Sequence, residues 1–258
     1  HRSVLIVSGG SMGSLFSGFL TAAAAASDNA FQVSIPPKNH LQVLLRANWK
    51  EHREAIQKNG LRVIPYSDAC KSIWKSIQSE YKQIEDMNTI SIPVRAVDDS
   101  VFDERNSGFT KFEAFDFVIS LPQVLLLDKS YNTESLAHEI KKVLTDSGVC
   151  LTLQNGMGNV EILQVAIPPF VSPAVLGKDR VVQGNTSQGA VLMGPGVVKH
   201  AGTGYITIAA PTPVQLHVEE LIVGGQNAAE WWVKTLNSIH LPAQLADENV
   251  SFASAHYQ

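Results

Sequence analysis

Short apolar runs alternate with helical periodicities along the first quarter of the chain. Residues 4–7 form an apolar run of strand length, residues 11–26 have a helical pattern, and residues 41–45 form a second apolar run. Another helical pattern follows at residues 48–59. Strands that alternate with helices are typical of a parallel sheet with crossover helices, so this order predicts an α/β fold.

The middle of the chain repeats this pattern after an insertion. "FDFVISLP" (115–122) and "GVCLTLQNG" (148–156) predict buried strands, and residues 132–148 between them predict a helix that ends at glycine. These three segments form a second βαβ unit. The insertion contains a charged helical pattern at 68–86 and a short strand at 90–97, and we interpret it as an elaboration on the sheet.

The last third of the sequence changes character. Apolar runs split by Gly-Pro-Gly and Gly-Thr-Gly at residues 189–209 are typical of antiparallel hairpins. A helix at 228–239, a short extended piece and a helix that begins near Asp247 complete the chain. The whole pattern predicts a doubly wound α/β fold whose mainly parallel sheet has an antiparallel extension.

Composition narrows the classes of function. The chain has 258 residues, of which 45% are hydrophobic, and its formal net charge is −4. It has no basic stripe, which argues against nucleic acid as a partner, and no apolar run of about 18 residues, which argues against a membrane span. We expect a cytoplasmic protein and leave mitochondrial targeting open, because the chain starts at His1 without a methionine.

The cysteines indicate neither a disulfide nor a metal site. Cys70 lies in a helical pattern and Cys150 lies in an apolar strand, and these are the two cysteines of the chain. We therefore expect reduced, buried thiols and no bound metal.

A glycine-rich turn joins the first strand to the first helix. Such a turn can hold the pyrophosphate of a dinucleotide, because glycines permit close approach and the helix N-terminus offers free N–H groups. Compared with G-x-G-x-x-G, the second and third glycines are present, and Ser8 replaces the first, with a neighbouring glycine to take over the turn. The expected cofactor-binding residues here are Gly9, Gly10, Ser11, Met12 and Gly13. An ordinary strand-to-helix turn is the alternative.

Arg46 ends the second predicted strand, where dinucleotide-binding proteins often carry an acid that binds the adenosine ribose. An arginine at this position can pair with a 2′-phosphate, which selects NADP over NAD. Arg46 lies 33 residues beyond Gly13, which exceeds the usual spacing of about 20. Two alternatives stay open: Arg46 is a solvated arginine at a helix start, or the true second strand lies near Val33.

Four segments in one order resemble the ketopantoate reductase family, also called 2-dehydropantoate 2-reductases. They are "RANWKEHREAIQKNGLRV", "FDFVISLPQ", "LTLQNGMGNVEIL" and "VVQGNTSQGAVLMGPGVVKHAGTGYITIA". The resemblance implies a Rossmann-like NADP-binding domain at residues 1–245, with residues 246–258 as the start of a C-terminal helical domain. It also implies NADPH-dependent reduction of ketopantoate, a small 2-keto acid, to pantoate.

The resemblance carries roles onto particular residues. The family's asparagine in the N-G-x-G turn falls on Asn155, where it would contact the nicotinamide and the reacting centre. Gly156 and Gly158 would let that turn approach closely. Ala190, in a Gly-Ala pair, falls where backbone lines the nicotinamide pocket. His200 lies in a hairpin, and we expect it to be structural or at the surface.

The sequence also departs from the family pattern. The family has a lysine in a V-K-x-x-Q pattern after the fourth core strand, and we align Gln123 of "LPQVLLL" with that lysine, near the cofactor. The family's catalytic lysine lies in a W-x-K-L pattern. Tyr257 takes the tryptophan position, so that lysine would be residue 259. General acid catalysis therefore has no candidate in the printed sequence.

These departures leave alternatives to ketopantoate reduction. One is a non-catalytic relative that serves as a nucleotide-binding or interaction module in a larger assembly, and another is a reductase of a different 2-keto acid. Without a helical domain to cover it, we expect an exposed apolar face near Trp231, Trp232 and the final helix. Such a face would favour a homo-oligomer or a partner protein.

Overall fold

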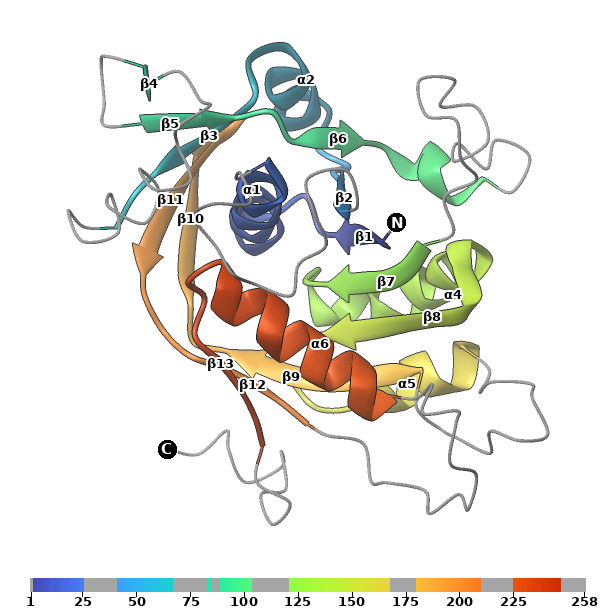
Figure 1. Ribbon diagram of the computed structural model, residues 1–258. Coiled ribbons are helices and arrows are strands. Elements are labelled where there is room, and N and C mark those ends of the chain that lie inside the picture. The colour runs from blue at the N-terminus through green and yellow to red at the C-terminus, as the bar shows by residue number, and fades with distance from the viewer. Residues whose placement is uncertain are drawn as a thin grey trace.

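An eight-stranded sheet forms the centre of the molecule (Figure 1). The computed structural model describes residues 2–25, 41–66, 83–84, 89–103, 121–167, 180–209 and 225–246. The strand order is β13-β12-β9-β8-β7-β1-β2-β6. The strands are β1 (Arg2–Val7), β2 (Leu41–Arg46), β6 (Arg95–Val97), β7 (Leu121–Leu126), β8 (Leu144–Thr152), β9 (Val181–Thr186), β12 (Ile206–Ile208) and β13 (Ala243–Leu245).

Six of these strands, from β6 to β9 in the sheet order, run parallel to one another, and β12 pairs antiparallel with β9. The predicted fold class is therefore confirmed: a mainly parallel sheet with an antiparallel extension. β2 pairs directly with β1, with Arg46 opposite Val7. The alternative second strand near Val33 is thus wrong as the neighbour of β1.

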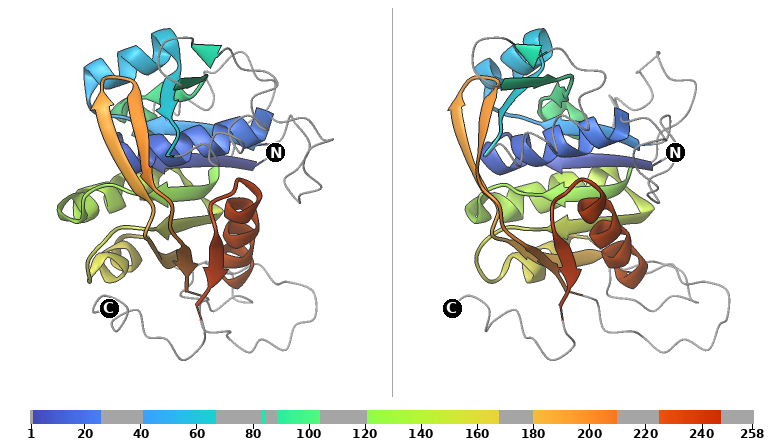
Figure 2. Two further views of the ribbon diagram at one scale, coloured as in Figure 1. Left: turned by 90° about the vertical axis from the view of Figure 1, so that its left-hand side faces the viewer. Right: turned by 60° about the vertical axis from the view of Figure 1, so that its left-hand side comes forward.

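Helices cover both faces of the sheet (Figure 2). Side chains alternate along β1: Val4 and Ile6 belong to one buried cluster, and Leu5 and Val7 belong to another. The first cluster includes residues of α1 and α6, and the second includes residues of α4 and α5. The helices are α1 (Ser11–Ala25), α2 (Lys50–Asn59), α4 (Thr133–Val143), α5 (Asn159–Ala166) and α6 (Gly225–Ser238).

A second sheet packs against α1 on the side away from the main sheet (Figure 1). Its order is β10-β11-β3-β5-β4. The strands are β3 (Leu61–Ile64), β4 (Gln83–Ile84), β5 (Thr89–Ile92), β10 (Gly189–Gly194) and β11 (Val197–Gly202). Helix α1 therefore lies between two sheets, which explains why its sequence is apolar on all sides.

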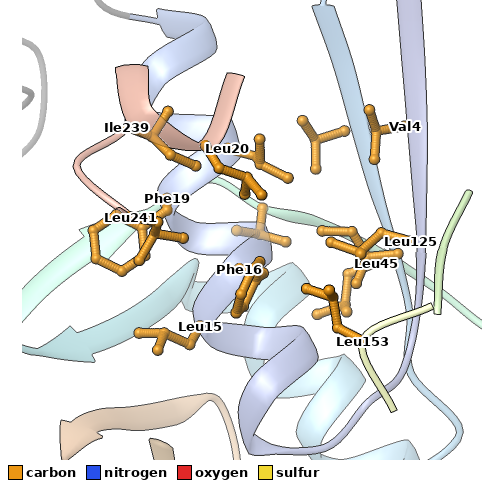
Figure 3. Close-up of a cluster of buried hydrophobic side chains, with 14 of the residues drawn as sticks. Val4, Leu15, Phe16, Phe19, Leu20, Leu45, Leu125, Leu153, Ile239 and Leu241 are labelled. Atoms are coloured by element: carbon orange, nitrogen blue, oxygen red, sulfur yellow. The ribbon is translucent and has the colours of Figure 1, made fainter. Parts of the chain in front are cut away.

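Small residues allow the second sheet to approach α1 closely. A Cβ on Gly18 would lie 3.3 Å from side-chain atoms of both Leu61 and Val63 on β3. Figure 3 shows the larger side chains of α1, among them Phe16 and Leu20, packed with residues of several strands and with the segment after α6. The enclosure of α1 fixes the position of its N-terminal turn.

The structure corrects several predicted boundaries. The hairpin at 189–202 does not extend the main sheet, because β11 pairs with β3 of the second sheet. The predicted strand at 90–97 divides into β5 and β6 at Pro93, which has no N–H for a continuous ladder. Within the predicted helix 68–86, Gln83 and Ile84 form a strand, and most other residues of that segment lie outside the described part.

β7 extends farther along the sequence than predicted. It covers Leu121–Leu126, whereas the prediction was 115–122, and residues 104–120 lie outside the described part. The helix predicted at 132–148 ends at Val143, and β8 begins directly afterwards at Leu144. Cys70 and the helix near Asp247 also lie outside the described residues, so these predictions and the domain boundary at 245 stay predictions.

Cys150 is a buried free thiol in β8, as predicted, and burial raises its pKa to about 12. The expected exposed face near the two tryptophans is wrong for Trp232, which is fully buried. Its indole Nε1 donates to Gln123 Oε1 on β7 at 3.0 Å. Among the described helices, none is long and apolar enough to cross a membrane.

His52 of α2 joins α1 to the second sheet. The backbone N–H of Gly196, in the β10–β11 turn, donates to His52 Nδ1 at 2.9 Å. His52 Nε2 therefore carries the proton and donates to Ser14 Oγ of α1, also at 2.9 Å. The imidazole is fully buried, and this burial lowers its pKa from the ordinary value. Protonation would remove the acceptor that the Gly196 N–H needs.

The free energy of unfolding is expected to fall as the pH drops below about 6.5. At such pH values His52 binds a proton in the unfolded chain but stays neutral in the folded chain. Replacing His52 by glutamine is expected to flatten this dependence and to lower stability at pH 8 by about 1–3 kcal/mol. Urea unfolding between pH 8 and pH 5 measures both effects. His138→Gln, at an exposed position, is the control. An unchanged pH slope in His52→Gln would contradict the assignment.

Candidate functional site

A cleft of about 260 Å³ opens at the carboxyl ends of β1, β7, β8 and β9. It is lined by residues 8 and 10–12 from the β1–α1 turn, 127–130 after β7, 153–155 after β8, and Thr186 and Gln188 at the end of β9. The chain leaves β1 for β2 on one side, while β7 pairs with β1 on the other. Ligands of open α/β sheets bind in such a crevice, where the strand order reverses.

The β1–α1 turn is held together by its own serine. The Gly10 N–H donates to Ser8 Oγ at 3.2 Å, and the Ser14 N–H donates to the Gly10 carbonyl at 3.0 Å as the first bond of α1. The N–H groups at the start of a helix have no carbonyl partner within it. The first turn of α1 therefore offers backbone donors and a positive dipole end to the cleft.

The three glycines of this turn serve different purposes. A Cβ on Gly9 would lie 2.7 Å from the Ala47 Cα, so Gly9 permits contact with the β2–α2 loop. A Cβ on Gly13 would overlap the Ser8 carbonyl oxygen, so Gly13 allows α1 to pack onto the end of β1. A Cβ on Gly10 would meet only Ser8 Oγ within 4 Å, at 3.4 Å. Gly10 thus leaves open space beside its backbone at the cleft, and we call this space the cradle.

Arg46 ends β2 as predicted, but its charge is already paired. Its Nε donates to Asp99 Oδ1 at 2.7 Å, and its Nη1 donates to Asp128 Oδ2 at 3.3 Å. Its guanidinium carbon also lies 5.8 Å from the centre of the Phe102 ring. The Arg46 side chain is only 8% exposed. It is therefore not the solvated arginine of the alternative interpretation, and its role toward a 2′-phosphate stays a prediction.

Asn155 lines the cleft at the start of the turn after β8. Gly156 and Gly158 have φ angles of 101° and 87°, a backbone region that glycine adopts without strain. The Asn159 Nδ2 donates to the carbonyls of Asn155 and Gly156, both at 3.2 Å. The turn is thereby fixed from the first residue of α5. Its contact with a nicotinamide stays a prediction.

A buried amide network ties the Asn155 turn to the turn after β7. Gln154 Nε2 donates to the Asp128 carbonyl at 2.9 Å and to Thr133 Oγ1 at 3.0 Å. Thr133 Oγ1 lies 2.9 Å from Asn159 Oδ1 and can donate to it. All three side chains of this network, Thr133, Gln154 and Asn159, are buried. The turns after β7 and β8, which form two sides of the cleft, therefore stabilise each other.

The interpretation of Gln123 needs correction. Gln123 lies inside β7, opposite Val4 of β1, and its amide oxygen is bonded to Trp232. It is not among the residues that line the cleft. Sequence reasoning ended the strand too early, because "FDFVISLPQVLLLD" contains two apolar runs separated by a proline. Gln123 is therefore a packing residue of the sheet.

Lys129 is one of the cleft residues that sequence reasoning missed. It follows β7 and lines the cleft, and it makes no ion pair within the described part of the chain. Its backbone N–H donates to Asp128 Oδ1 at 2.7 Å, and Asn132 Nδ2 donates to the same oxygen at 2.9 Å. The spacing from Lys129 to Asn132 was the available signal, because it repeats the K-x-x-Q pattern with asparagine for glutamine.

At the end of β9, the cleft is lined by Gln188 and not by Ala190, which packs against the main hydrophobic cluster. Gln188 Oε1 lies 3.0 Å from Nε2 of His200, and its Nε2 donates to the Gly204 carbonyl. His200 is buried, and this burial lowers its pKa. The prediction of a structural histidine is thus confirmed, while the predicted pocket role of Ala190 has no support from this lining.

Among the described residues, the cleft therefore combines helix N–H groups, the Lys129 ammonium, the Asp128 carboxylate and several amide side chains. Such a set can bind an anion at the turn and hydrogen-bonding groups farther along the cleft. The described residues contain no group of three or more histidine, cysteine or acidic side chains that could hold a metal ion.

Comparison with known proteins identifies the family. A sequence profile described as Ketopantoate reductase PanE/ApbA matches residues 4–213. The chain belongs to this family. A PanE/ApbA relative, the 2-dehydropantoate 2-reductase of Halobacterium salinarum, is 28% identical over 205 residues. That match covers 80% of this chain and 48% of the relative, so the chain spans about half the length of this curated relative.

Solved structures with similar folds include a 2-dehydropantoate 2-reductase and a D-mandelate dehydrogenase. The 2-dehydropantoate 2-reductase of Porphyromonas gingivalis is 18% identical, with a TM-score of 0.60 over 96% of this chain and 65% of the other. A D-mandelate dehydrogenase solved with NADH and anilino(oxo)acetate is 20% identical, with a TM-score of 0.60 over 95% and 57%. At these identities the likeness establishes the fold of the chain.

Gly10 and Gly13 are expected to respond differently to substitution by alanine. Gly10→Ala should change the free energy of unfolding by less than about 0.5 kcal/mol, since its Cβ enters open space. Gly13→Ala should lower it by about 1–3 kcal/mol or more, because the new methyl group overlaps the Ser8 carbonyl. Urea denaturation of both variants measures the difference. Equal stability of the two variants would show that the β1–α1 packing is not as tight as described.

Proposed function

We propose that this chain binds NADPH in the cleft and forms the cofactor-binding part of a 2-dehydropantoate 2-reductase. The observation that carries the proposal is the open cradle at Gly10, at the N-terminus of a fully enclosed helix and at the switch point of the sheet. Family membership and the name of the Halobacterium salinarum relative support the reaction.

The residues of the cleft fit such a cofactor. The N–H groups of residues 11–13 and the cradle at Gly10 would hold the pyrophosphate. Arg46, at the end of β2, would face the ribose that carries the 2′-phosphate. Asn155 and Gln188, on the lips formed by β8 and β9, would bond the carboxamide end. Lys129 would place its positive charge beside the anionic groups of the cofactor or of the keto acid.

The bound cofactor supplies a hydride to the keto carbon of the 2-keto acid. The part of this chain is to bind, orient and enclose: the Thr133–Gln154–Asn159 network holds the Asn155 turn where a reacting group needs a fixed partner. A general acid must protonate the developing alkoxide. The resemblance assigns that acid to a lysine at position 259, so the complete reaction is proposed for a longer protein that contains this sequence.

Partners and location remain part of the proposal. We propose a small 2-keto acid as the substrate. A cytoplasmic location and association with a second copy or another protein stay predictions. Because Trp232 is buried against the sheet, that association cannot use its side chain.

Titration of the 258-residue chain with NADPH, followed by the fluorescence of the reduced nicotinamide, is expected to show saturable binding. Gly10→Val should weaken this binding by more than about tenfold, because its side chain fills the cradle and removes charge-assisted bonds to the pyrophosphate. Gly202→Val serves as a matched control, because a Cβ at that position meets no atom within 4 Å and Gly202 does not line the cleft. Unchanged affinity in Gly10→Val would mean that the glycine turn is only structural.

Turnover is tested with NADPH and ketopantoate on the 258-residue chain and on the longest product of the same gene. The longer product is expected to oxidise NADPH. The 258-residue chain is expected to be slower by about 10²- to 10³-fold or more, because no lysine from position 259 stabilises the alkoxide. Equal turnover by both would show that the acid lies within this chain. Binding without turnover in both would favour a nucleotide-binding module or a different 2-keto acid.

A further inference from the structure

The acid that β2 lacks is supplied by the turn that follows the neighbouring strand, β6. In many dinucleotide sites an acid at the end of β2 bonds the adenosine ribose, whereas here β2 ends with Arg46. β6 pairs with β2 and places Val97 opposite Arg46. Asp99 follows two residues later, at the start of a 3₁₀ turn (η2, Asp99–Phe102), and accepts from Arg46 Nε at 2.7 Å.

We propose that Asp99 is a specificity-determining residue that lowers the preference of this site for a 2′-phosphorylated dinucleotide by competing with the phosphate for Arg46. This inference rests on the proposed cofactor function. In the structure, Asp99 accepts from Nε of Arg46, which is one of the donors that an arginine can use to bind a phosphate in a bidentate manner. A 2′-phosphate must therefore displace the Asp99 carboxylate or bind beside it.

The local charge balance supports this competition. Arg46 pairs with Asp99 and Asp128, and Arg53 Nη2 lies 3.6 Å from Asp98 Oδ2. Hydrogen bonds from Ser100 hold the pKa of Asp98 below its ordinary value, which keeps that carboxylate charged. In these three ion pairs, three carboxylates face two guanidinium groups. The electrostatic energy that a phosphate dianion gains on binding is small in such surroundings. A ribose 2′-hydroxyl, in contrast, can donate to a carboxylate at small electrostatic cost.

Of the two acids that pair with Arg46, Asp99 is the one that can move away from the guanidinium group. Asp128 Oδ1 accepts from the Lys129 N–H and from Asn132 Nδ2, and its side chain is only 15% exposed. Moving it would loosen the turn after β7. The Asp99 side chain is 61% exposed, and among the described residues its carboxylate is bonded to the Arg46 side chain. Its carboxylate can therefore turn away or be replaced without disturbing the cleft.

The test compares two non-reacting probes, 2′-phospho-ADP-ribose and ADP-ribose, by isothermal titration calorimetry at fixed low ionic strength. Asp99→Asn removes one charge and keeps the side-chain shape. Glu54→Gln removes one charge from an exposed side chain that lies 3.8 Å from Lys50, and it controls for net charge. Arg46→Ala removes the proposed phosphate ligand, and thermal unfolding checks that each variant is folded.

Asp99→Asn is expected to tighten the 2′-phosphorylated probe about fivefold or more, since one repulsive unit charge within a few ångströms is removed. ADP-ribose should keep its affinity or bind more weakly, and Glu54→Gln should change neither. Arg46→Ala should weaken only the phosphorylated probe. If Asp99→Asn leaves the ratio of the two affinities within twofold of wild type, the proposal for Asp99 is overturned. If the wild-type chain binds neither probe, the proposed cofactor function itself fails.

Discussion

The enclosure of α1 between two sheets is the constraint on which the rest of the structure depends. The helix cannot shift without opening a buried cluster that contains residues of both sheets. Gly13 fixes how closely its first turn packs onto β1, and His52 joins its Ser14 to the hairpin of the second sheet. The N–H groups that point to the cleft are consequently held by the core and not by the loop alone.

Electrostatics then decide what this fixed turn can accept. The lining of the cleft contains Lys129 as its cation and Asp128 as its acid, and the acid is neutralised from behind by Arg46. This arrangement differs from a site in which an arginine stands free for an anion. The Arg46–Asp128 pair joins β2 to the turn after β7, so the residue that we propose as the 2′-phosphate ligand also stabilises the fold.

The sequence was sufficient for the elements with an unambiguous pattern. Residues 4–59 contain an apolar run, a glycine turn and clear helical periodicity, and each element lies close to its prediction. β3 was missed because four residues carry little periodicity, and its partner β11 lies far along the chain. The end of β7 was predicted too early because Pro122 interrupts the apolar pattern, and periodicity cannot show whether the strand continues beyond it.

The sequence likewise predicted some residues of the cleft and missed others. Gly10 and Asn155 could be located because their motifs follow strands, and the structure places both at the cleft. The partners of Arg46 could not be found, because Asp99 and Asp128 come from segments that only the folded sheet brings together. Lys129 could not be recognised once its strand had been placed too early.

The short connection at Pro93 links the two sheets covalently. β5 belongs to the second sheet and β6 to the main sheet, and only Pro93 and Val94 separate them. Because this connection is so short, β5 and β6 cannot move far apart without disturbing the hydrogen bonds of both sheets. We therefore expect amide hydrogens of β5 and β6 to exchange with solvent through a shared opening event.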